Sequence, residues 1–289
     1  MTVDQWINVL VTITLLEMMV AIGLGVGLAD VAGVGRNWRV VTRAVLANYV
    51  CVPAAAVGLL ALFRPEPLVA AGFLIAAVCP GAPYGPPFTA MAKGNVAVSV
   101  GLMVMLAGSS AVIAPLLLRF LLPLVSSGDS LKVDAAKIVF TLLVVQLLPL
   151  CVGLAVRARC PNLAARLLKP ANLLSAVLNL SVIGLILVVQ FQTLAAIRPM
   201  GFAGMLALVL AALAAGWVLG MPGSGHRKAM AITTSVRNVG VSLVIATSSF
   251  PDTPAVTAAL AFALLQTVVM AMVALGWGRL APATTGSLR

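Results

Sequence analysis

The stretch CPGAPYGPP, residues 79–87, interrupts an apolar run that is otherwise long enough to cross a bilayer. It holds four prolines and two glycines in nine residues. Proline lacks the backbone N–H that a helix interior uses, and its ring clashes with the preceding turn, so this stretch cannot continue a helix. Residues 67–92 are therefore predicted to form two half-helices separated by a break.

The composition around this break is that of a membrane protein. Hydrophobic residues make up 62% of the chain, charged residues only 9%, and the mean hydropathy is +1.15. Soluble domains carry about 25% charged residues. The net charge is +11, and the basic residues that produce it lie in short loops between apolar runs. No basic tract is interleaved with exposed aromatic residues, so no nucleic-acid partner is expected. One histidine and four dispersed cysteines offer no metal site, cofactor site or catalytic arrangement, so no enzyme is expected.

Nine apolar runs follow one another along the chain, and most exceed 18 residues. Because a backbone in lipid must satisfy its own hydrogen bonds, each run is predicted to be helical. The predicted fold is an all-α membrane protein of about nine transmembrane helices, with the lipid bilayer as partner. The runs cover residues 5–28, 37–62, 67–92, 95–122, 134–156, 170–191, 199–220, 227–249 and 254–278.

The Lys and Arg residues sort unequally between the two sides that these spans define. Of the 18, twelve fall on one side, five on the other, and Arg237 lies within a span. Cytoplasmic loops are the richer in Lys and Arg. The bias predicts a multi-pass protein of the plasma (inner) membrane, with its N-terminus outside and its C-terminus in the cytoplasm.

A second break is expected in the eighth span, where TTSVRNVG, residues 233–240, is polar. The third and eighth spans run in opposite directions, which is typical of inverted repeats with interrupted helices. We expect a first repeat at 1–122, a connecting fifth span at 123–168, a second repeat at 169–280 and a disordered tail at 281–289. The alternative is that Pro and Gly merely kink packed helices.

Three segments resemble the bile acid:sodium symporter family. They are CPG at 79–81, MAKGNVAVSV at 91–100 and RNVG at 237–240. The resemblance covers roughly residues 8–280. It implies secondary transport by alternating access, with a core domain that holds both crossing helices and a panel domain made of spans one, two, five and six.

The same resemblance implies two sodium ions near the crossing, but this chain departs at the positions that would hold them. Those positions are Asn48, Gly85, Pro86, Ser99, Met103, Thr233 and Arg237. Only Asn48, Ser99 and Thr233 keep a side-chain oxygen, and no carboxylate remains, whereas a hard cation favours charged oxygen ligands. We therefore expect transport without the two-sodium coupling. The alternative is a symporter that holds sodium through backbone carbonyls.

Arg237 leaves three interpretations open. Its guanidinium has five donors and no acceptor. It would replace the ion as a tethered cation, act as counter-charge for a small organic anion, or turn away to the cytoplasmic face. The candidate substrate-binding residues are Arg237, Asn238, Pro83, Thr89, Gln266 and Thr267.

Glu17 is a second ionisable residue at membrane depth. It would couple transport to protons, or it would pair with a basic or amide group and hold helices together. A rival function is a channel-like or sensory membrane protein on the same scaffold.

Overall fold

The computed structural model describes residues 3–125, 131, 133–189, 191–192, 197 and 199–280, so the tail expected at 281–289 lies outside it. The described residues form helices and no strand. Eight of these helices are long and apolar enough to cross a bilayer, and α5 is a shorter apolar helix. Together with α6, α5 makes the interrupted segment predicted at 67–92.

The chain order begins with α1 (Val3–Gly25), α2 (Leu28–Arg36), α3 (Trp38–Leu46), η1 (Ala47–Cys51), α4 (Val52–Phe63), α5 (Pro67–Val78), α6 (Gly85–Met91) and α7 (Val96–Val125). It continues with α8 (Ala135–Leu142), η2 (Leu143–Leu147), α9 (Leu148–Arg159), α10 (Pro161–Val189), α12 (Pro199–Leu219), α13 (Ser224–Ser235), α14 (Val239–Ser249) and α15 (Pro254–Leu280).

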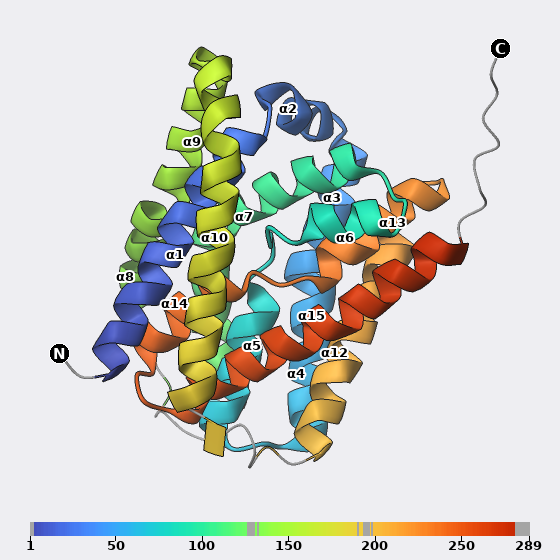
Figure 1. Ribbon diagram of the computed structural model, residues 1–289. Coiled ribbons are helices and arrows are strands. Elements are labelled where there is room, and N and C mark those ends of the chain that lie inside the picture. The colour runs from blue at the N-terminus through green and yellow to red at the C-terminus, as the bar shows by residue number, and fades with distance from the viewer. Residues whose placement is uncertain are drawn as a thin grey trace.

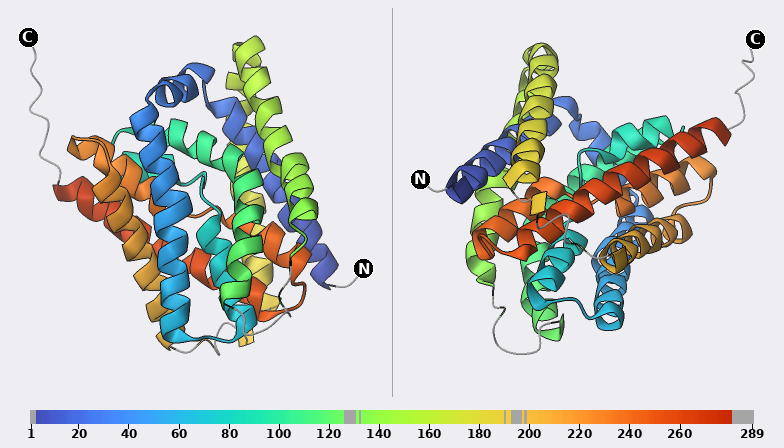
Figure 2. Two further views of the ribbon diagram at one scale, coloured as in Figure 1. Left: turned by 180° about the vertical axis from the view of Figure 1, so that it is seen from behind. Right: turned by 60° about the horizontal axis from the view of Figure 1, so that its bottom comes forward.

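The helices form two groups, which lie side by side in Figure 1 and are seen from behind and from below in Figure 2. In the smaller group α1 packs against α9 and α10. In the larger group α5 packs against α15, α12 packs against α13, and both broken helices lie within it. We call these groups the panel and the core. They meet where α1 contacts α14 and where α7 contacts α8 and η2.

The second span belongs to the core, contrary to the expectation that it would join the panel. The segment α3–η1–α4 packs against α12 and α5. Its face toward the core carries Val52, Ala56 and Leu60, all buried. Small and branched side chains on that face allow close packing between helices, which the family resemblance alone did not indicate.

Two glycines bring α1 and α9 into contact. A Cβ built on Gly23 would lie 2.5 Å from the carbonyl oxygen of Leu150, and one built on Gly153 would strike the backbone of Val20. Small residues let helix backbones approach closely in membranes. Gly23 therefore allows close packing between α1 and α9, whereas Gly27 lies outside α1 as the N-cap of α2.

The segments η1 and η2 are single turns of π-helix, each just before a proline. Pro53 follows η1 and Pro149 follows η2. A proline removes one helical hydrogen bond and crowds the preceding turn, and a wider turn relieves this. Each π-turn carries a buried amide side chain, Asn48 in η1 and Gln146 in η2.

Candidate functional site: the crossing of two broken helices

The first break runs from Cys79 to Tyr84, between α5 and α6, as the prolines predicted. Gly81 has φ +86°, a left-handed conformation that side chains disfavour. It also lies against α7, where an added Cβ would overlap the backbone of Ala107. Glycine is thus required twice at this position, by the turn of the chain and by the neighbouring helix.

The second break, at residues 236–238, lies between α13 and α14. Asn238 caps α14, because its side-chain oxygen accepts the N–H of Val241 at 3.3 Å. The hydroxyl of Ser242 donates to the carbonyl of Asn238 at 2.8 Å. The polar stretch that predicted this break therefore also begins the second half-helix.

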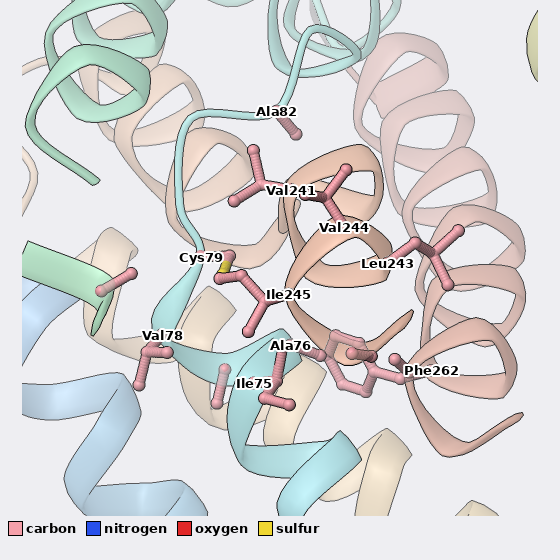
Figure 3. Packing of buried hydrophobic residues seen from close by; sticks show 14 of the residues in the cluster. Ile75, Ala76, Val78, Cys79, Ala82, Val241, Leu243, Val244, Ile245 and Phe262 are labelled. Carbon is pink, nitrogen blue, oxygen red and sulfur yellow. The ribbon is translucent and has the colours of Figure 1, made fainter. Parts of the chain in front are cut away.

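The two breaks cross and are hydrogen-bonded to each other. The N–H of Asn238 donates to the carbonyl of Cys79 at 2.8 Å, and its side-chain amide donates to the carbonyl of Gly81 at 3.3 Å. Figure 3 shows the extended segment after α5 running beside α14, with Cys79 next to Ile245. Backbone groups that a break would leave bare in lipid are satisfied here by the other break.

The guanidinium of Arg237 lies at the centre of this crossing with 1% of its surface exposed. Its Nη1 donates to the carbonyl of Ala77 at 3.3 Å, and its Nη2 donates to the carbonyl of Thr234. Both carbonyls belong to the last turns of half-helices, α5 and α13. The interpretation in which Arg237 turns away to the cytoplasmic face is wrong.

Gln266 on α15 holds the backbone of Arg237 in place. Its side-chain oxygen accepts the N–H of Arg237 at 2.9 Å, and its amide donates to the carbonyl of Arg237 at 3.0 Å. One buried amide thus replaces two helical hydrogen bonds lost at the break. The Nε atom of Arg237 is buried and has no hydrogen-bond partner among the described residues.

A short chain of hydroxyls connects α6, α7 and α13. Thr89 donates to the hydroxyl of Ser99 at 3.0 Å, and Ser99 and Thr233 share a hydrogen bond of 3.0 Å. A Cβ on Gly85 would sit 3.6 Å from the Ser99 hydroxyl and 3.7 Å from that of Thr233. Four of the sequence-predicted positions therefore come together, and none of them carries a charge.

The remaining predicted residues lie outside this chain of hydroxyls and differ in burial and in hydrogen bonding. Asn48 is buried and donates to the hydroxyl of Thr234 at 3.3 Å, while its Oδ1 has no partner among the described residues. Pro86 and Met103 are buried, on α6 and α7. Pro83 is half-buried within the first break, and Thr267 is exposed and bonds only within its own helix, to Ala263.

Glu17 is not part of the crossing. It is half-buried on α1 and accepts a hydrogen bond of 2.5 Å from the hydroxyl of Ser175 on α10, inside the panel. The predicted basic or amide partner is instead a hydroxyl. This contact joins two panel helices.

Sequence reasoning missed two polar residues that are hydrogen-bonded to α7. Gln146 donates to the carbonyl of Ala107 at 2.5 Å and to the hydroxyl of Ser110 at 3.1 Å. The hydroxyl of Tyr49 donates to the carbonyl of Leu106 at 3.1 Å. The available signal was a polar residue within an apolar run, three or four positions before a proline.

Apolar spanning helices arranged around two crossed, interrupted helices define a multi-pass membrane protein of a kind that includes many secondary transporters. Over residues 12–218 the sequence matches the Sodium Bile acid symporter family. The chain belongs to this family, whose members are transporters and not enzymes.

Two relatives carry names of the same kind. An uncharacterized sodium-dependent transporter of Bacillus subtilis (strain 168), YocS, is 26% identical over 284 residues, which is 95% of this chain and 84% of that protein. The probable chloroplastic sodium/metabolite cotransporter BASS2 of Oryza sativa subsp. japonica is 28% identical over 170 residues, which is 59% of this chain and 39% of that protein.

Proposed function

We propose that the protein is a secondary transporter of a small organic anion that works by alternating access without the two-sodium coupling of its family. The observation that carries this proposal is the position of the Arg237 guanidinium, which donates to the carbonyls of Ala77 and Thr234. The C-terminal ends of half-helices and unwound carbonyls are where broken-helix transporters hold their cations. Arg237 supplies that cation from within the chain.

A sodium ion beside this guanidinium would be strongly disfavoured. Two like charges about 4 Å apart repel by about 4 kcal/mol at an effective dielectric constant of about 20. The nearby oxygens of Ser99 and Thr233 are neutral, and neither position offers a carboxylate to offset the repulsion. The names of the two relatives point to sodium, so this departure is the specific claim to be tested.

The anionic charge of the substrate follows from the charge of the same cluster. Arg237 is its only ionised residue among the side chains named above, so the crossing carries one positive charge. Asn238 and Gln266 lie beside it as polar contacts, and Thr89 belongs to the neighbouring chain of hydroxyls. In this proposal the anion approaches near Pro83 and Thr267, which are not buried, and is attracted by the guanidinium without displacing it from its carbonyls.

The movement would be a rocking of the core against the panel. The panel and core here are the two packed groups described above, and the repeats would comprise residues 1–122 and 169–280, with 123–168 connecting them. The N-terminus would lie outside and the C-terminus in the cytoplasm, as the charge bias favours.

A thermal-shift screen of organic anions on the purified wild type and Arg237→Gln, each with sodium and with choline, tests this function. We expect at least one anion to raise the melting temperature of the wild type equally in both salts, and to raise that of Arg237→Gln less. Stabilisation of the wild type by sodium alone would instead favour the symporter with carbonyl ligands. Counterflow in proteoliposomes separates a carrier from a channel, because only a carrier exchanges labelled for unlabelled substrate.

Proton coupling through Glu17 remains the second candidate for the driving force. Its carboxylate is half-buried, and the hydroxyl of Ser175 is its one hydrogen-bond partner in the described structure. Uptake by Glu17→Gln measured across a range of pH decides it. An unchanged pH profile would assign Glu17 a structural role between α1 and α10.

A further inference from the structure

A pocket lies in the core, away from the crossing. Its volume is about 520 Å³, and it is lined by the end of α4 and the beginnings of α5, α12 and α15. Figure 1 shows the ends of α4, α5 and α12 together at the bottom of the molecule. Pockets that bind small molecules have volumes of about 300–1,000 Å³ and mostly apolar walls.

The lining of this pocket is mostly apolar. It includes Leu59, Phe63 and Val69. Phe73 also lines it and packs edge-on against Phe262, with 5.9 Å between the ring centroids. Ala258 lines it as well, and it precedes Gln266 by about 12 Å along α15 at 1.5 Å per residue. None of the pocket's lining residues belongs to the Arg237 cluster.

The mouth of the pocket carries positive charge. Arg64 lines it, and the structure gives this side chain no ion pair with any described residue. Three helices begin around the mouth, α5 at Pro67, α12 at Pro199 and α15 at Pro254, and helix N-termini carry partial positive charge. Glu66 is the one acidic residue of the lining, and its charge opposes that of Arg64, so the net positive potential at the mouth comes from the three helix N-termini.

We infer that this pocket binds an amphipathic organic anion, with an apolar chain between α4, α5, α12 and α15 and a carboxylate at Arg64. The apolar walls take the chain because removing it from water is favourable in proportion to buried area. The guanidinium and the three helix N-termini take the carboxylate. This site is independent of the transport site, and the proposed function does not depend on it.

Dodecanoate is the test ligand, with dodecanol and dodecyltrimethylammonium as uncharged and cationic comparisons. The full-length protein is placed in nanodiscs of zwitterionic lipid at mildly alkaline pH, and binding is measured by calorimetry. A diazirine derivative of dodecanoate then locates the site by cross-linking and mass spectrometry. We expect saturable binding of dodecanoate, weaker binding of dodecanol, none of the cation, and cross-links on the pocket lining.

Two pairs of variants test the charge and the cavity. Arg64→Gln is compared with Arg119→Gln, an exposed arginine outside the pocket lining, and Leu59→Trp with Leu62→Trp, an exposed residue on the same helix. We expect Arg64→Gln to weaken dodecanoate binding about fivefold to tenfold and to leave dodecanol unchanged. We expect Leu59→Trp to abolish binding of both, and both controls to behave as the wild type.

Several outcomes would overturn the inference. They are no saturable binding to the wild type, equal binding to Leu59→Trp and the wild type, and no effect of Arg64→Gln. Weaker binding of dodecanoate to Glu66→Gln would also overturn it, because removing an acidic group from the pocket should not weaken the binding of an anion. Should Leu59→Trp fail to fold, Val69→Trp fills the same pocket from α5.

Discussion

The guanidinium of Arg237 donates to the carbonyl of Ala77 at 3.3 Å, although the two residues are 160 positions apart in sequence. This contact joins the end of the half-helix α5 to the break that follows α13. A helix end buried without a partner would leave carbonyls unsatisfied, and here a positive side chain satisfies two of them. The exposed carbonyls at the crossing are therefore satisfied by a cation that belongs to the protein itself.

Sodium dependence should be restorable by substitution. In the double variant Arg237→Gln and Thr233→Glu, the tethered cation is removed and a carboxylate is supplied beside Ser99 and the freed carbonyls. We expect sodium to stabilise this variant, by about 2.7 kcal/mol when its concentration is one hundred times the dissociation constant. Melting temperatures in sodium and in choline measure the effect, and the wild type should show none. Equal melting temperatures of the double variant in both salts would contradict the prediction.

Gln266→Leu should be strongly destabilising. It leaves the N–H and the carbonyl of Arg237 buried without partners, and each unsatisfied group costs about 1–3 kcal/mol. We expect a total loss of about 2–6 kcal/mol, measured as a lower melting temperature in detergent. The neighbouring Thr267→Ala is the control, because that hydroxyl is exposed and bonds only to its own helix. Similar melting temperatures for the two variants would be the contrary result.

The contact between α1 and α9 should not tolerate a larger residue at Gly23. A β-branched side chain there meets the backbone of α9, which cannot move away as a flexible side chain does. We expect Gly23→Val to lose about 1–3 kcal/mol or more through overpacking. Gly184→Ala, at a helical position with open space around it, should be neutral or stabilising by up to about 1 kcal/mol. Thermal denaturation of both proteins provides the comparison.

The hydroxyls of Ser99 and Thr233 should be energetically coupled. Each Ala substitution removes one partner of a buried hydrogen bond of 3.0 Å, at a cost of about 1–3 kcal/mol. The double substitution should cost less than the two single ones together, by about 0.5–3 kcal/mol, since the bond is lost only once. A double-mutant cycle on the free energies of unfolding gives the coupling energy. Strict additivity of the two single-variant losses would show that the pair does not interact.

The sequence by itself determined the fold class and both breaks. Apolar runs of spanning length require helices in lipid, and the prolines of residues 79–87 exclude a continuous helix whatever surrounds them. The polar stretch at 233–240 indicates the second break. These inferences depend on local chemistry, which a sequence states directly, whereas the expectation that Ser99 and Thr233 lie near the crossing came from the family resemblance.

The tertiary structure decided which groups meet. The inward position of Arg237 depends on the carbonyl of Ala77, 160 residues distant, and the two hydrogen bonds from Gln266 depend on the packing of α15 against the break. The second span joined the core because of the face it presents to α12 and α5, a contact between segments far apart in the chain. Hydropathy and helix-breaking residues are local properties, whereas the partner of a buried polar group is chosen by the packing of the whole chain.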